Sequence, residues 1–212
     1  ERIGKGLYFH FFNVLNTEKI IKNLVKAEKE GFDGVAIGCF VDPALVEARE
    51  LLKIPVAGMG EVSLLCSKLY GRKFVIIDNS VREVKKFITP MIKKYGLEEV
   101  DYRVFGFDLP PEVLKKCFVH PEPLIETFID ICRKAREWDT EVIIPGCGII
   151  NIVLIKNQIH QIDHIPILDT TGLLLKMIEA MVLLQNVSGA ATSRKGYYES
   201  PPEEEVFKVF KL

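Results

Sequence analysis

The sequence lacks the features that mark several large classes of protein. Its longest nearly apolar stretch, residues 142–155, is shorter than a membrane-spanning helix and is interrupted by proline and glycine. The 28 basic and 29 acidic residues give a formal net charge of −1, without a basic stripe for nucleic acid or anionic lipid. No P-loop or GxGxxG sequence follows any expected strand. We therefore expect no membrane span, no nucleic-acid partner and no nucleotide site.

The cysteines also lack the pattern of a disulfide framework. There are 5 of them, an odd number, and no two are spaced as CxxC. A chain of 212 residues buries enough surface to fold without cross-links. No charged segment followed by an apolar run opens the sequence, so we expect no secretory signal and a cytoplasmic protein with free thiols. His160 and His164 are four residues apart without a third ligand at a recognisable spacing, and we expect no metal site.

Alternating strand and helix signals predict an α/β fold. Short apolar runs between turn residues predict buried strands at 34–38, 54–58, 73–77, 141–145 and 165–168. Helical periodicity is found between these runs, at residues 17–31, 42–52, 61–71, 80–95, 123–137 and 171–185. Asp42 and Pro43 are the expected N-cap and first residue of the second helix. Strands separated by such helices form parallel sheets covered on both faces.

Two segments of the sequence, 32–65 and 138–175, follow the same pattern. Each passes through an aromatic residue with aspartate, an apolar strand, Gly-Cys, a helix, Ile-Pro, a glycine-containing turn and another helix. This repetition predicts two pseudo-symmetric lobes, each a mostly parallel sheet flanked by helices. Ligands in open α/β sheets bind outside the carboxyl ends of the strands. We therefore expect an active-site cleft between the lobes, with Cys39 on one wall and Cys147 on the other.

Two facing thiols can invert a stereocentre without a cofactor. A thiol close to the N–H groups at a helix start has its thiolate stabilised, so it can serve as a base near neutral pH. The thiolate removes a proton from one face of a carbon acid while the other thiol delivers a proton to the opposite face. Backbone amides that follow the thiols can hold the oxygen on which charge develops: those of Phe40, Val41, Gly148 and Ile149.

Other polar residues are weaker candidates for the same edge of the sheet. Asp78 and Asn79 follow the strand at 73–77 and either border the site or cap the next helix. Glu61 follows a turn and either favours a helix N-terminus or orients a neighbour in the cleft. The remaining cysteines lack matched surroundings and are interpreted as core residues: Cys66, Cys117 and Cys132.

Three segments resemble the hydantoin racemase branch of the aspartate/glutamate/hydantoin racemase superfamily. GCFVDPALVEARELLKIPVAGMGE (38–61) resembles its first catalytic segment, EVIIPGCGI (141–149) its second, and TSRKGYYESPP (192–202) its tail. The resemblance covers about residues 5–202. It implies a cofactor-independent racemase of a small molecule, usually a homo-oligomer, with Cys39 and Cys147 as the catalytic pair. It also implies a set of residues that border the substrate: Phe40, Asp78, Asn79, Gly148 and Ile149.

The sequence also departs from this branch. Its members usually begin with a strand that ends in an Asn-Pro turn, so we expect the first lobe to lack its N-terminal strand. This lobe would hold residues 1–78 with about 186–212, and the second lobe residues 79–185. Asp78 stands where relatives often have threonine, and adds negative charge that disfavours a free carboxylate. Ile149 and Ile150 make the second site apolar, which favours an uncharged ring or an apolar side chain.

These observations leave several functions open. The leading hypothesis is racemisation of a 5-substituted hydantoin or a related amino-acid derivative. An aspartate/glutamate-type racemase or a maleate-isomerase-like enzyme would keep the fold and change the substrate. A malonate decarboxylase needs only one thiol, so the pair argues against it. A non-catalytic small-molecule-binding protein would have two thiols of ordinary acidity.

Overall fold

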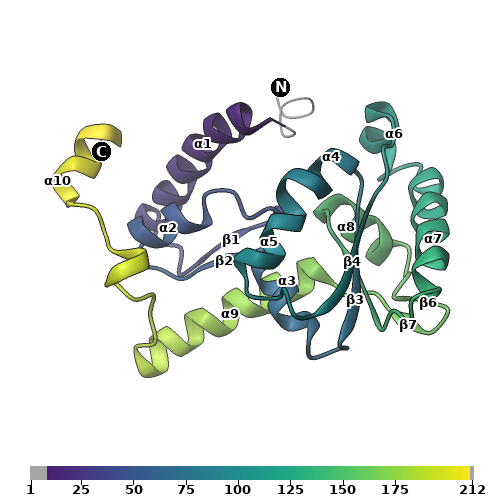
Figure 1. Cartoon of the computed structure of the whole chain (residues 1–212). Coiled ribbons are helices and arrows are strands. Elements are labelled where there is room, and N and C mark those ends of the chain that lie inside the picture. The colour runs from purple at the N-terminus through teal and green to yellow at the C-terminus, as the bar shows by residue number, and fades with distance from the viewer. Residues whose placement is uncertain (1–8, 211–212) are drawn as a thin grey trace.

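Parallel sheets flanked by helices make up the centre of the computed structural model, which describes residues 9–210 (Figure 1). In the first sheet, β1 (Val35–Ile37) pairs in parallel with β2 (Val56–Gly58). In the second, β3 (Lys73–Asp78) lies between β4 (Asp101–Gly106) and β5 (Val142–Pro145), again in parallel. A short antiparallel hairpin joins β6 (Gln161–Ile162) to β7 (Ile165–Pro166). The expected α/β class is confirmed.

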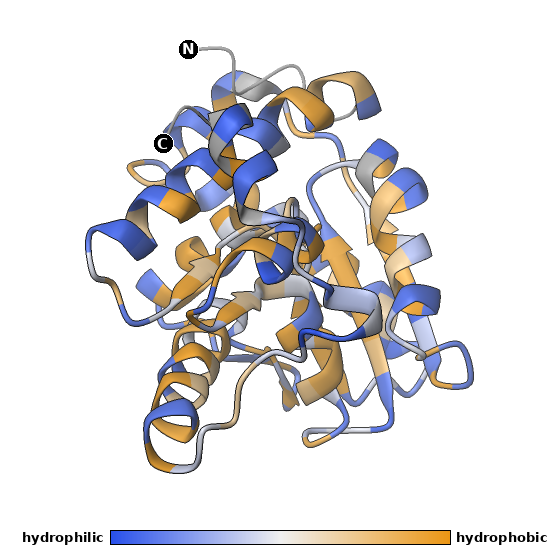
Figure 2. Cartoon of the chain, turned by 90° about the vertical axis from the view of Figure 1, so that its left-hand side faces the viewer, coloured by the Kyte–Doolittle hydropathy of each residue, from blue (hydrophilic) through white to orange (hydrophobic). Residues whose placement is uncertain are grey.

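Helices cover both faces of the second sheet because its central strand is apolar on both sides. Phe74 and Ile76 of β3 belong to one buried cluster, and Val75 and Ile77 belong to another. None of these four side chains is more than 2% exposed. Figure 2 shows the resulting concentration of hydrophobic residues along the strands.

The helices follow the expected order with shifted bounds. On the first half of the chain they are α1 (His10–Lys29), α2 (Leu45–Leu51), α3 (Met59–Ser67), α4 (Val81–Glu83), the π-helix Val84–Ile88 and α5 (Thr89–Lys94). On the second half they are α6 (Pro111–Lys116), α7 (Glu122–Arg136), α8 (Gly148–Lys156), α9 (Thr170–Ser188), the 3₁₀ turn Gly196–Tyr198 and α10 (Glu203–Phe210). None of the helices within residues 9–210 combines the length and apolar character that a membrane crossing requires.

One expected strand is shorter than predicted, and one expected division falls within a sheet. The strand expected at 165–168 is reduced to Ile165–Pro166, and Ile167 adds one parallel bridge to Ile143 of β5. The division expected after residue 78 would separate β3 from β4 and β5, with which it pairs along its length. The second sheet therefore spans the division expected after residue 78.

Helix α9 connects the second sheet back to the first. It packs against α3 and against β1 and β2. The approach is close at Gly34, where an added Cβ would lie 2.7 Å from a methyl group of Val182. Elements from both ends of the chain thus support the short first sheet, whose β1 leads directly to Cys39.

Candidate active site

Both Gly-Cys segments lie immediately after a parallel strand. Gly38 and Cys39 follow β1, and Gly146 and Cys147 follow β5. Both thiol-bearing residues are half-buried. Each therefore stands at the carboxyl end of a strand, the edge at which open α/β sheets bind their ligands.

The structure brings the two segments into contact. A Cβ placed on Gly148 would lie 3.3 Å from the carbonyl oxygen of Gly38 and 3.5 Å from Cε of Met59. The backbone beside Cys147 thus packs on the backbone beside Cys39, with Met59 of α3 next to both. Although the two cysteines are 108 positions apart in the sequence, they occupy adjoining turns.

Cys147 is the N-cap of α8. Its backbone is extended, with φ −142° and ψ 130°, and its carbonyl accepts the first helical hydrogen bond from the amide of Asn151 at 3.1 Å. The partial positive charge of a helix N-terminus stabilises a negative group at this position. The expected placement of this thiol at a helix start is therefore observed.

Cys39 lies in a turn that is separate from the next helix. The amide of Asp42 donates to the carbonyl of Cys39 at 3.0 Å, and Asp42 and Ala44 have positive φ values of 47° and 65°. Helix α2 begins only at Leu45, with Ala44 as its N-cap. The interpretation of Asp42 as the cap of this helix is therefore wrong.

Asp42 instead caps α3. Its carboxylate accepts hydrogen bonds from the amides of Gly60 at 2.8 Å and Glu61 at 2.6 Å. The N-cap of α3 is Gly58, which has no side chain to accept these bonds, so a residue from another segment supplies the acceptor. The hydroxyl of Tyr95 donates to the same carboxylate at 2.7 Å.

Burial dominates the electrostatics of this aspartate. Asp42 is 4% exposed. Burial raises the pKa of its carboxyl to about 6, although the hydrogen bonds from Tyr95 and the two amides oppose the shift. Burial and the adjacent carboxylate also raise the pKa of Tyr95, which keeps this phenol a donor.

Glu61 pairs with Arg49 of α2. The two side chains form a bidentate ion pair with N···O distances of 2.5 Å and 2.8 Å. Arg49 also donates to the carbonyl of Val56 and to the hydroxyl of Tyr198 in the C-terminal segment. The carboxylate of Glu61 thus joins α2, α3 and the tail.

Asp78 lies beside the second thiol segment. It is 1% exposed, and its Cβ is 3.2 Å from a Cβ placed on Gly146, the residue before Cys147. Its carboxylate accepts a hydrogen bond from the amide of Ser80 at 2.8 Å, as in a capping turn. The neighbouring Asn79 is 9% exposed. Both candidates therefore lie at the expected edge, in nearly buried positions.

The residues that follow the thiols differ in exposure. Phe40 is 2% exposed and packs in the core with Met59 and Met91, so only its backbone is left to border a substrate. Val41 and Gly148 are half-buried, and Ile149 is 37% exposed. The backbone amide is the group of Phe40 that the sequence predicts for the site.

The other three cysteines are core residues. Cys66, Cys117 and Cys132 are buried, and burial raises the pKa of each thiol, that of Cys132 to about 12. A thiol of this kind is protonated at neutral pH and cannot serve as a base.

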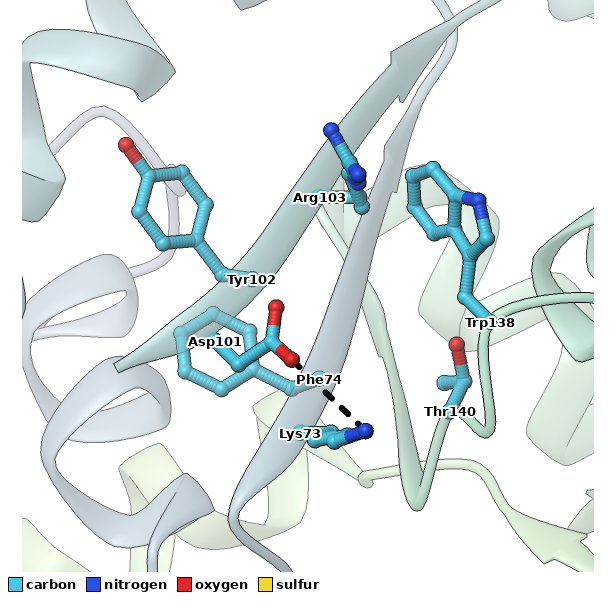
Figure 3. Close-up of a pocket in the computed structure, with 7 residues that line it drawn as sticks. All are labelled: Lys73, Phe74, Asp101, Tyr102, Arg103, Trp138 and Thr140. Atoms are coloured by element: carbon cyan, nitrogen blue, oxygen red, sulfur yellow. Dashed lines mark ion pairs between the residues drawn. The ribbon is translucent and has the colours of Figure 1, made fainter. Parts of the chain in front are cut away.

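A small cavity lies at the opposite edge of the second sheet (Figure 3). It has a volume of about 140 Å³ and is lined by residues at the starts of β3 and β4, with Trp138 and Thr140. Lys73 pairs with Asp101 at 3.7 Å, and the Arg103 guanidinium lies 4.0 Å from the ring centre of Trp138. This cavity is remote from the cysteines, because β3 runs from Lys73 to Asp78 between the two edges. Among the residues the structure describes, no cluster of three or more His, Cys, Asp or Glu could hold a metal ion.

A family model for Asp/Glu/hydantoin racemases matches residues 13–178. The chain belongs to this family. It is 28% identical over 182 residues to a hydantoin racemase of Rhizobium meliloti, which covers 86% of this chain and 72% of that protein. It also resembles the allantoin racemase from Klebsiella pneumoniae, with a TM-score of 0.78 and 26% identity over 91% of this chain and 75% of the other.

More distant racemases share the fold alone. The glutamate racemase RacE1 of Bacillus anthracis superposes with a TM-score of 0.64 at 14% identity, over 88% of this chain and 70% of that one. The resemblance read from the three sequence segments is confirmed, and with it the isomerase class. The protein is a racemase of this family.

Asp42, Tyr95 and Arg49 were not among the residues singled out in the sequence as site candidates. Asp42 had a local signal, the Asp-Pro pair, but this signal pointed to the wrong helix. Tyr95 and Arg49 carried none, because both meet their partners only through tertiary contacts.

Proposed function

We propose that this racemase inverts the stereocentre of a 5-substituted hydantoin or a closely related cyclic amino-acid derivative, with Cys39 and Cys147 as the two proton carriers and without a cofactor. The observation that carries the proposal is the contact between the two Gly-Cys segments at the carboxyl ends of β1 and β5. Two half-buried thiols on adjoining turns supply one group for each face of a bound carbon acid.

The reaction needs only a proton removed and a proton returned. The thiolate of one cysteine takes the proton from C5 of the ring, and the bond electrons pass into the adjacent carbonyl as an enolate. Backbone amides at the start of α8 favour the negative oxygen. The thiol of the other cysteine then gives its proton to the opposite face. The two sulfurs have exchanged protonation states, and the product is the mirror image of the substrate.

The proposed substrate class is an uncharged ring. Allantoin is itself a hydantoin with a ureido group at C5, so the named hydantoin and allantoin racemases both support chemistry at this carbon. Asp78 is buried beside the Cys147 segment, and Ile149 is partly exposed on the same side. A carboxylate and an apolar side chain next to the site disfavour a free amino-acid carboxylate.

Polarimetry of the purified chain tests this proposal. Both enantiomers of 5-benzylhydantoin, enantiopure allantoin, L-aspartate and L-glutamate are each followed with the wild type, with the Cys39→Ser/Cys147→Ser double variant and without protein. Cys66→Ala is the matched control, because Cys66 is a buried thiol outside the site. We expect the rotation of at least one ring substrate to decay to zero with the wild type and the control, but at the uncatalysed rate with the double variant.

Three results would contradict the proposal. A double variant that racemises at the wild-type rate would show that the thiols are not the proton carriers. Turnover of aspartate or glutamate without turnover of any ring would show that the substrate class is wrong. No turnover of any compound would favour the non-catalytic binding protein.

A further inference from the structure

The turn that carries Cys39 is fastened by one buried carboxylate. Asp42 lies three positions after the thiol, and its backbone amide closes the turn onto the carbonyl of Cys39. Its side chain accepts three hydrogen bonds, from Gly60, Glu61 and Tyr95, at 2.6–2.8 Å. Gly60 and Glu61 lie in α3 and Tyr95 is the C-cap residue of α5, so two helices hold the turn through Asp42.

The first turn of α3 packs directly on the Cys39 turn. An added Cβ on Gly60 would lie only 2.0 Å from the carbonyl oxygen of Phe40, and one on Gly58 would lie 2.5 Å from the Asp42 carboxylate. Glycine is required at both positions by this approach. Between them in sequence is Met59, whose Cε lies 3.5 Å from a Cβ placed on Gly148, the residue after Cys147. The start of α3 thus contacts both thiol segments.

We propose that Asp42, held by Tyr95, is a positioning residue for Cys39 that sets this thiol against the start of α3 and so opposite Cys147. The inference rests on the proposed function, since it assigns a role to Asp42 through the Cys39 thiol. Asp42 does not act on the substrate itself. Its role is to keep the Cys39 turn at a fixed place relative to Met59 and the Cys147 segment.

The hydrogen-bond donors around Asp42 are matched to an ionised carboxylate, although burial and the charge of Glu61 oppose its ionisation. Tyr95 faces it from α5 and Glu61 from α3, and Glu61 is neutralised by Arg49 of α2. An ionised carboxylate can accept all three hydrogen bonds, with one oxygen shared by Glu61 and Tyr95. One oxygen of a protonated carboxyl carries a hydrogen, which makes that oxygen a poorer acceptor for the two backbone amides and Tyr95. With a pKa of about 6, the carboxylate is ionised at neutral pH and is lost in mild acid.

Two variants separate this role from general support of the fold. Asp42→Asn keeps the size and shape of the side chain but replaces one carboxylate oxygen by an NH₂ group, which then faces either the Gly60 amide or the donors Glu61 and Tyr95. Tyr95→Phe removes one hydrogen-bond donor. Asp101→Asn and Tyr70→Phe are matched controls, because both residues are exposed and lie away from the Cys39 turn. Each variant is measured for kcat and KM on the ring substrate. Peptide-resolved mass spectrometry then follows the alkylation of Cys39 relative to Cys147.

We expect Asp42→Asn to lower kcat by about 100-fold, the scale of a misplaced catalytic group, with a smaller change in KM. Tyr95→Phe should lower kcat by about tenfold, because one of three hydrogen bonds is lost. In both variants the ratio of Cys39 to Cys147 alkylation should change by at least about threefold, while the controls keep the wild-type ratio. The kcat of the wild type should fall as the pH drops through about 6, and this fall should be absent in Asp42→Asn.

The inference and the proposed function fail in different ways. A wild-type kcat and a wild-type alkylation ratio in both variants would overturn the positioning role. A lower kcat with equal changes at both cysteines would also overturn it, since Asp42 would then only support the fold. If Asp42→Asn does not fold, Tyr95→Phe decides by the same two readouts. A Cys39→Ser variant with wild-type kcat would instead overturn the proposed function, whatever the Asp42 variants do.

Discussion

The two thiol segments share a sequence pattern but are held in place by different means. Cys147 is the N-cap of α8, and its carbonyl starts the helix. Cys39 is followed by a turn with two positive-φ residues, and α2 begins only at Leu45. The position of Cys147 therefore depends on local helix formation, whereas that of Cys39 depends on contacts with α3 and α5.

This difference determines where each segment is sensitive to change. Substitutions far along the chain, at Glu61, Tyr95 or Tyr198, reach the Cys39 side through Asp42 and Arg49. The Cys147 side responds to changes in α8 and in the packing of Gly148. The acid-base role proposed for both thiols would thus rest on a long-range network at Cys39 and on one helix at Cys147.

The largest expected effect comes from the ion pair that supports the Cys39 side. Replacing Arg49 by alanine leaves the Glu61 carboxylate without its partner, and the side chains are only 10% and 16% exposed. We expect the free energy of unfolding to fall by about 3 kcal/mol in urea denaturation. Lys176→Ala, which removes an exposed pair with Glu179, should change it by less than about 1 kcal/mol. Equal effects of the two variants would contradict the network.

Asp42 should give the Cys39 side a distinct pH dependence of stability. Its folded pKa of about 6 lies above the ordinary aspartate value of 3.8, so between these values the folded state binds more protons than the unfolded state. The free energy of unfolding should therefore fall as pH rises through this window, by about 2–3 kcal/mol relative to Asp42→Asn. Urea denaturation of both proteins from pH 3.5 to 7 measures the difference. Parallel pH profiles would show that the burial of Asp42 has no such effect.

A smaller effect tests the contact between the two thiol segments. An alanine Cβ at Gly148 would press on the Gly38 carbonyl at 3.3 Å, whereas one at Gly38 meets nothing within 4 Å. We expect Gly148→Ala to lower kcat by about tenfold and stability by about 1 kcal/mol. Gly38→Ala should leave stability within about 0.5 kcal/mol of the wild type. The contact is unimportant if both variants unfold and react like the wild type.

The smallest expected effect compares the thiols directly. Iodoacetamide at pH 7 should modify Cys147 faster than Cys39 by about two- to fivefold, because the first turn of α8 stabilises its thiolate. The buried Cys66, Cys117 and Cys132 should react only after denaturation. Peptide-resolved mass spectrometry of a time course measures all five rates. Faster reaction of Cys39 would contradict the claim that the start of α8 makes Cys147 the more reactive thiol.

Much of the fold and the central site could be predicted because their signals are local. The strands β1, β2, β3 and β5 are apolar runs between turn residues, and the Gly-Cys segments follow two of them. β4 was not predicted, since it is an edge strand whose residues are exposed or half-buried and include Asp101 and Arg103. An edge strand of this kind has no continuous apolar run.

The supporting residues could not be predicted for a different reason. Asp-Pro before a helical pattern is a strong local N-cap signal, and this signal assigned Asp42 to α2. The helix that lacks a capping side chain is α3, whose N-cap, Gly58, lies 16 positions after Asp42 in the sequence. Only the fold brings the Asp42 carboxylate to the start of this helix. The start of α1 at His10, before the expected residue 17, has a similar cause. Phe11, Val14 and Leu15 have the spacing of a helix face, but Thr17 offers a local cap signal, whereas the actual N-cap, Phe9, makes no side-chain capping bond.

The most direct test of the two-thiol account follows exchange at C5 in D₂O by proton NMR. Cys39→Ser and Cys147→Ser are each incubated with the separate enantiomers of a turned-over 5-substituted hydantoin, beside a sample without protein. We expect neither variant to racemise the substrate, and each to exchange the C5 proton of one enantiomer only, the opposite one in the two variants. Racemisation by either variant, or exchange of the same enantiomer by both, would contradict the assignment of one thiol to each face.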